Sequence, residues 1–213
     1  MPPRRPPPVG SQITGSGVAG GRRGSVRLGK TAAMADLETL LAHHEITQVI
    51  YRYARGIDRL DFDLVRSCYH PDAYDDHGTM KGDVDTFIEG CRRFLPRFEA
   101  TQHFMGNLLI EVDGDRARAE TYAVAYHRKK NADGTGKDDV WGIRYVDRFE
   151  RRDGAWKIAH RVVAQEWRRV DPVPAGRIRD FGEGLWGTRD GNDAIDWVMT
   201  ARSPLLTGPA STG

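Results

Sequence analysis

The feature that most constrains the fold is a change of hydrophobic period near residue 100. Before it, apolar residues recur every three or four positions, as in amphipathic helices, over 37–58, 61–70 and 83–95. After it, apolar and polar residues alternate, as in strands, over 101–112, 115–130, 138–152 and 155–169. Asp113-Gly114 and Asp153-Gly154 are two-residue hairpin signals. Helices followed by an antiparallel meander predict an α+β fold, with a cavity between a curled sheet and the first helix.

The first helix leads to Asp58. Gly56 is where the helix is expected to turn, which places Asp58 just beyond its last apolar turn. A loosened last turn would bring Tyr53 and Asp58 into one cavity. The alternative for Asp58 is a loop residue or a cap for the next helix, for which Asp61 is a second candidate.

Three regions follow from composition. Residues 1–33 are rich in Pro, Gly, Ser and Arg and hold six of the 32 basic residues but no acid, so we predict a disordered tail, with Met34 as the natural start. Residues 34–170 form the expected domain. Residues 171–213 are a C-terminal extension with a helix near 193–201 and apolar side chains that favour a lid or an oligomer contact.

Charge and cysteine content exclude several classes. Without its tail, the chain has more acids than bases, which argues against nucleic-acid binding. Cys68 and Cys91 form neither a disulfide framework nor a metal pair, and no apolar run is long enough to span a bilayer. We expect a soluble cytoplasmic protein with no membrane partner.

Strand parity sorts the candidate pocket residues. One face of the first long strand carries His103, Met105, Asn107 and Leu109. On the second, His127 shares a face with Ala119, Thr121, Ala123 and Ala125. On the third, Trp141, Ile143 and Tyr145 lie together. A face of small residues ending in a histidine leaves space for a ligand.

His103 is the sharpest candidate for chemistry, because imidazole exchanges protons near neutral pH. A carboxylate such as Asp58 would fix its tautomer, and Tyr53 could polarise a substrate oxygen. For His43, His44, His70 and His77, a structural or solvated role is favoured. The histidine spacing does not favour a metal, and phosphate or nucleotide motifs are lacking, so no cofactor is expected.

The chain resembles the SnoaL-like branch of the NTF2-like superfamily, which includes scytalone dehydratase, bile-acid 7α-dehydratase, ketosteroid isomerase and hexachlorocyclohexane dehydrochlorinase. The resemblance rests on the helix ending in Tyr53 and Asp58, on the strand TQHFMGN and on the hairpin RYVDRFERRDGAWKIAHR. It implies a cone-shaped α+β barrel, with helices packed on a strongly curved sheet.

The resemblance also implies roles. Asp58 and His103 match a general-base dyad, Tyr53 a pocket tyrosine, His127 a second pocket histidine and Arg161 an arginine that assists the leaving group. Met105, Asn107, Leu109, Trp141, Ile143 and Tyr145 would bind the substrate.

The predicted function is therefore a cofactor-independent lyase of the dehydratase type. Its partner would be a small hydrophobic cyclic substrate such as a steroid or polyketide, and the protein is expected to be a homo-oligomer, a dimer or trimer. The alternatives are an isomerase or cyclase of the same fold, or a non-catalytic protein that binds a small ligand or serves as a subunit.

Overall fold

The computed structural model describes residues 30–175, 186–191 and 193–198. The helices are α1 (Lys30–Arg59), α2 (Phe62–Ser67), α3 (Val84–Phe94) and the short α4 (Ala194–Trp197), with a 3₁₀ turn at Leu95–Arg97. The strands are β1 (Tyr69–His77), β2 (Met80–Asp83), β3 (Ala100–Asp113), β4 (Arg116–Lys130), β5 (Gly136–Arg152) and β6 (Ala155–Val173). The α+β architecture and the four long strands predicted from the sequence are confirmed.

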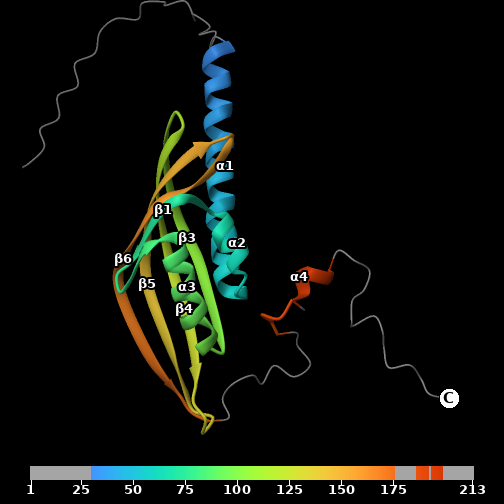
Figure 1. Cartoon of the computed structure of the whole chain (residues 1–213), viewed down its shortest axis with the longest axis vertical. Coiled ribbons are helices and arrows are strands. Elements are labelled where there is room, and N and C mark those ends of the chain that lie inside the picture. The colour runs from blue at the N-terminus through green and yellow to red at the C-terminus, as the bar shows by residue number, and fades with distance from the viewer. Residues whose placement is uncertain (1–29, 176–185, 192, 199–213) are drawn as a thin grey trace, which may run out of the picture.

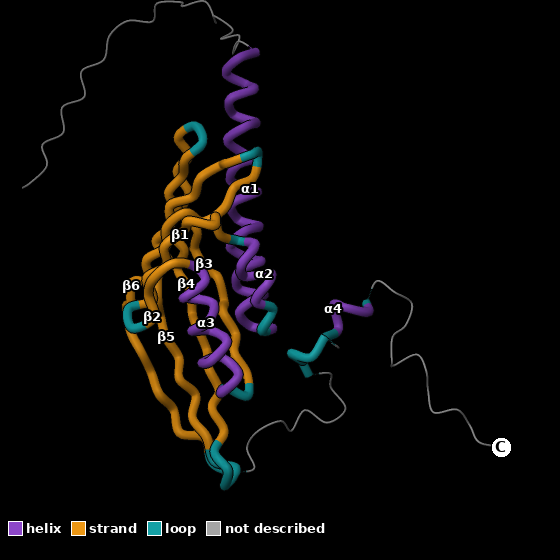
Figure 2. The backbone as a smooth tube through the Cα atoms, viewed as in Figure 1, coloured by secondary structure: helices purple, strands orange, loops and turns teal. Residues whose placement is uncertain are grey.

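The strands form one curved sheet in the order β2-β1-β6-β5-β4-β3 (Figure 1). Neighbours are antiparallel except β1 and β6, which run parallel. Figure 2 shows the long strands bending along their length, with α1 and α3 beside them. Buried side chains of α1 and α3 join those of the inner sheet face in one core. This arrangement places the ends of several elements around the space that the helices and the sheet enclose.

α1 ends later than the sequence suggests. Gly56 does not terminate it, and Asp58 lies within its last turn rather than in a loop. Gly56 instead allows a close approach, because a Cβ there would lie 2.7 Å from a methyl carbon of Val65 on α2. The helix ends at Arg59, since Leu60 has a left-handed φ of 58°. The close contact with α2 therefore decides the position of Asp58.

The caps of the two shorter helices follow the sequence. Asp61 accepts a hydrogen bond of 2.9 Å from the Leu64 N–H at the start of α2. Asp83 accepts one of 2.8 Å from the Thr86 N–H at the start of α3. Side-chain oxygens at these positions satisfy N–H groups that the first turn leaves free.

Bulges interrupt the regular alternation of the four long strands at three points, and the pairing of β1 with β6 shifts register between Tyr69 and Tyr74. β3 has an extra residue between Met105 and Leu108, and β6 has extra residues opposite the steps Arg148–Phe149 and Gly142–Ile143. Each bulge transfers the following side chains to the opposite face of the sheet. The face assignment from sequence therefore holds for β4 and β5 but fails along parts of β3 and β6.

The terminal regions are described only in part. α1 begins at Lys30, inside the segment predicted to be disordered, and residues 1–29 lie outside the described part of the chain. The predicted helix near 193–201 corresponds to α4, with its last residues outside the described ranges. In the portion that the structure describes, no helix combines the length and the apolar character that crossing a membrane requires.

Candidate functional site

A cavity of about 430 Å³ lies between α1, α3 and the inner face of the sheet. Its wall is mostly apolar and aromatic, but three histidines, His77, His103 and His127, open onto it together with Tyr53. A volume in this range suits a small organic ligand.

Asp58 and His103 form a hydrogen-bonded pair at one end of the cavity. Nδ1 of His103 and Oδ1 of Asp58 are 2.8 Å apart, and the His103 backbone N–H donates to Oδ2 at 2.8 Å. The side chains are 7% and 14% exposed, respectively. The carboxylate thus fixes Nδ1 as the protonated nitrogen of neutral His103, which leaves Nε2 available to accept a proton.

The surroundings of Asp58 favour its charged form. Burial acts to raise its pKa, but the hydrogen bonds and positive charge of His103 outweigh burial and hold the pKa below the usual value. Thr101 also contributes a hydrogen bond to the carboxylate. A charged Asp58 can therefore orient His103 and stabilise its protonated form.

Arg189 supports this end of the cavity from the C-terminal segment. Its guanidinium donates to the Asp58 backbone carbonyl at 3.1 Å, to the Phe98 carbonyl at 2.9 Å and to the Thr101 hydroxyl at 2.7 Å. These bonds join the end of α1 to the start of β3. The sequence offered no signal for this contact, because residues 58 and 189 are far apart in the chain.

His127 lies edge-on against His103, with ring centroids 5.4 Å apart. Burial, followed by the charge of His103, lowers its pKa to about 4, so His127 is neutral at pH 7. Its Nδ1 atom is buried and has no hydrogen-bond partner among the described residues. A neutral imidazole in the cavity wall is suited to hydrogen bonding with a ligand rather than to acting as an acid.

Tyr53 lies in the cavity wall, and Arg161 lies buried behind it. Tyr53 reaches the cavity wall, and burial raises the pKa of its hydroxyl well above the usual value. The Arg161 guanidinium lies 4.1 Å from the Tyr53 ring centroid and 4.3 Å from that of Tyr145. Nε and Nη2 of Arg161 donate to the two oxygens of Asp147, each at 2.7 Å. Arg161 is completely buried beneath the tyrosines and does not line the cavity, which corrects its predicted position in the pocket.

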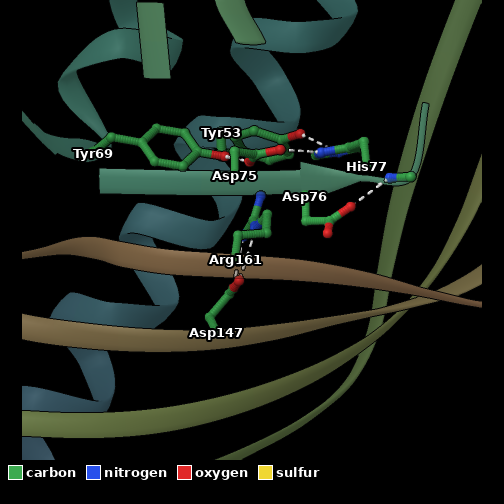
Figure 3. Close-up of polar contacts among 8 residues, drawn as sticks. Tyr53, Tyr69, Asp75, Asp76, His77, Asp147 and Arg161 are labelled. Carbon is green, nitrogen blue, oxygen red and sulfur yellow. Dashed lines mark hydrogen bonds and ion pairs between the residues drawn. The ribbon is translucent and has the colours of Figure 1, made fainter. Parts of the chain in front are cut away.

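A second Asp–His pair, which the sequence analysis did not single out, lies on β1 (Figure 3). A carboxylate oxygen of Asp75 contacts Nδ1 of His77, and the other accepts a bond of 2.7 Å from the Tyr69 hydroxyl. Nε2 of His77 is 3.3 Å from the Tyr53 hydroxyl oxygen. A signal was available, because residues two apart in a strand share a face. The sequence favoured a structural or solvated role for His77, so the pair was missed.

No cluster of three or more His, Cys, Asp or Glu side chains suited to a metal ion occurs within the described ranges. The two Asp–His pairs supply the cavity with groups for proton transfer and hydrogen bonding.

Comparison with known proteins agrees with this architecture. A family model described as a SnoaL-like domain matches residues 38–162. The chain belongs to this family. The match extends from α1 into β6 and therefore covers both Asp–His pairs.

Relatives of this SnoaL-like protein include an uncharacterized protein of Mycobacterium tuberculosis that is 29% identical over 121 residues, which are 55% of this chain and 81% of that protein. Among solved structures, a type 2 hexachlorocyclohexane dehydrochlorinase aligns with a TM-score of 0.59 and 20% identity, covering 69% of this chain and 99% of that one. A candidate scytalone dehydratase from Novosphingobium aromaticivorans aligns with a TM-score of 0.56 and 18% identity, covering 66% and 97%. At these identities the structural likeness supports the fold.

The predicted substrate-binding residues of the SnoaL-like domain fall into two groups. Trp141, Ile143 and Tyr145 line the cavity. Met105 packs against the core without lining the cavity, while Asn107 and Leu109 lie on the outer face, where Leu109 is 61% exposed. The bulge after Met105 explains the error, because it turns Leu108 inward in place of its neighbours.

Proposed function

We propose that this SnoaL-like protein is a cofactor-independent lyase of the dehydratase type, acting on a small hydrophobic cyclic compound that carries a carbonyl group. The observation that carries the proposal is the Asp58–His103 pair, hydrogen-bonded at 2.8 Å at the edge of a mostly apolar cavity. A histidine whose Nδ1 is held by a carboxylate has its Nε2 free as a general base.

The proposed reaction begins with proton abstraction. Nε2 of His103 takes a proton from the carbon next to the substrate carbonyl, and Asp58 stabilises the imidazolium that forms. The electron pair of the C–H bond then forms a carbon–carbon double bond while a hydroxyl on the adjacent carbon departs. Such general-base groups contribute typically about 10²–10⁴ in rate.

Two neighbouring groups suit substrate binding. Tyr53 keeps its proton because burial raises its pKa, so it can donate a hydrogen bond to the carbonyl oxygen as negative charge develops there. Neutral His127, whose ring lines the cavity, can form a hydrogen bond with a substrate hydroxyl. Trp141 and Ile143 supply apolar contacts for a ring system.

The fold relatives support a reaction of this class. One is a hexachlorocyclohexane dehydrochlorinase and another a candidate scytalone dehydratase. Both names describe eliminations from a ring. Fold likeness does not decide function, so the proposal depends on the residues in the cavity.

The test uses 1-tetralone, a bicyclic ketone, as a probe of the base. Binding is first measured by quenching of tryptophan fluorescence, since Trp141 lies in the wall. In D₂O, the protein should accelerate deuterium exchange at the carbon beside the carbonyl. We expect His103→Gln and Asp58→Asn each to lower this rate by about 100-fold or more.

Asp76→Asn is the matched control, because Asp76 is close to the site in sequence but bonds the exposed Gly78 N–H. It should leave exchange unchanged. A probe that binds to the wild-type protein without exchanging, or exchanges equally in the His103→Gln variant, would refute general-base catalysis and leave a ligand-binding protein.

A further inference from the structure

We infer that His77, held by Asp75, is the general acid of the same cavity, a role that rests on the proposed elimination. His77 would protonate the departing hydroxyl while His103 removes the proton from carbon. The cavity would then hold two Asp–His pairs with opposite tasks, one that accepts a proton and one that donates it.

The His77 side chain is positioned to reach a ligand in the cavity. His77 lines the same cavity as His103, although it comes from β1 whereas His103 comes from β3. Its ring stacks on Phe87 of α3 with centroids 4.6 Å apart, and the side chain is 17% exposed. It is therefore fixed in place yet accessible to a bound ligand.

The charged side chains beneath the cavity do not balance one another. Asp75, Asp147 and Arg161 are all buried, with exposures of 0%, 2% and 0%. Two carboxylates and one guanidinium leave one uncompensated negative charge, which is costly away from water. An additional proton would neutralise the cluster.

The hydrogen bonds of the buried cluster indicate which group holds this proton. Burial raises the pKa of Asp147, but both of its oxygens accept bonds from Arg161, which leaves neither oxygen with a free position for a proton. Both oxygens of Asp75 are also engaged, one by Tyr69 and one by His77. The remaining titratable groups stay uncharged because burial raises the pKa of each: Tyr53, Tyr69, Tyr145 and Cys91. His77 is the member of this cluster that lines the cavity with a ring nitrogen suited to proton transfer, and its Nε2 lies 3.3 Å from the Tyr53 hydroxyl oxygen, a contact that a bound leaving group would replace.

The other candidates for the acid are less suited to the task. Tyr53 holds its proton too tightly, because burial raises its pKa well above the usual value. His127 is neutral at pH 7, since burial lowers its pKa to about 4.

In the proposed elimination, each histidine transfers one proton. His103 gains the proton from the carbon beside the carbonyl, and the electrons of that C–H bond form the carbon–carbon double bond. The C–O bond to the leaving hydroxyl breaks with its electron pair on oxygen, and Nε2 of His77 supplies the proton that makes water. Exchange of protons with solvent then restores both histidines.

The experiment compares two leaving groups on one ring. 3-Hydroxy-1-tetralone must lose water, yielding fluorescent 1-naphthol, whereas 3-chloro-1-tetralone loses chloride, which needs no proton. In the His77→Gln variant we expect dehydration to fall by about 100-fold or more, while chloride elimination and deuterium exchange into 1-tetralone stay within about threefold of wild type. His103→Gln should instead lower all three rates.

Asp75→Asn should show the same selective loss as His77→Gln, and Asp76→Asn should show none. Circular dichroism and thermal unfolding check that the variants are folded. An equal loss with both leaving groups would make His77 a structural residue, and unchanged dehydration would exclude it as the acid; either result overturns the inference. Loss of exchange in His103→Gln is a separate readout, so the general-base proposal stands or fails independently.

Discussion

His103 and His127 are adjacent in the cavity wall, but their partners differ. His103 has a carboxylate on Nδ1, whereas His127 has a buried nitrogen without a partner among the described residues. The neutral state of His127 is therefore imposed by burial and by the neighbouring imidazole. Two identical side chains in one wall thus have different hydrogen-bond partners, and burial keeps His127 neutral.

This difference predicts how stability depends on pH. The pKa of His127 falls from 6.5 to about 4 on folding, so between these values the unfolded chain binds a proton that the folded protein does not. Lowering the pH from 7 to 5 should thus cost about 2 kcal/mol through this residue.

Urea unfolding at both pH values checks this prediction. The His127→Gln variant should lose about 2 kcal/mol less than wild type on acidification. His44→Gln is the control, since His44 is exposed on α1 and should leave the pH dependence unchanged. An identical pH dependence for wild type and His127→Gln would contradict the lowered pKa.

At the scale of elements, bulges decide which side chains of the long strands face the cavity. In β6, Arg161 and Val163 face inward after the bulge that follows Ile158. The second bulge comes after Gln165, and both Gln165 and Arg168 line the cavity. In β3 one bulge turns Leu108, Ile110 and Val112 inward instead of Asn107 and Leu109. The inner wall therefore consists of segments in different registers.

A pair of neighbouring leucines tests this account. Leu108 packs against the core, whereas Leu109 is 61% exposed. Leu108→Ala should lower the free energy of unfolding by about 2 kcal/mol, near the low end for a buried leucine because Leu108 is only partly buried. Leu109→Ala should change it by less than about 0.5 kcal/mol, measured by urea unfolding. The reverse order would place the bulge elsewhere.

At the scale of the whole molecule, the C-terminal segment is part of the site. Arg189 bonds to Asp58, Phe98 and Thr101, and Arg59 forms an ion pair of 3.0 Å with Asp193. The end of α1, the start of β3 and the segment near residue 190 are thereby joined. The extension predicted as a lid or oligomer contact thus bonds the elements that carry Asp58 and His103.

Arg189→Met should remove these hydrogen bonds while keeping much of the side-chain volume. Because it leaves two carbonyls and a hydroxyl without their donor, we expect a loss of about 2 kcal/mol in the free energy of unfolding. Arg169→Met is the control, since the Arg169–Asp171 ion pair lies on the surface and its loss should cost less than about 1 kcal/mol. Equal effects of the two substitutions in urea unfolding would show that Arg189 contributes no more than a surface ion pair.

The sequence by itself determined the helices α1, α2 and α3, the four long strands β3 to β6, and the cap at Asp61. These features depend on local period, on turn residues and on motifs that lie within short stretches. Family resemblance added the curved sheet, because related chains keep the same sequence pattern.

Only the tertiary structure decided the position of Arg161 beneath Tyr53, the inward turn at Leu108, the contact of Arg189 and the second pair, Asp75 and His77. Each depends on a strand register or on a contact between distant segments. A bulge exchanges the two faces of a strand without altering its composition, and a buried cluster can be balanced only when all its charges are in place. These contacts join residues that are distant in the chain, so the order of residues alone does not reveal them.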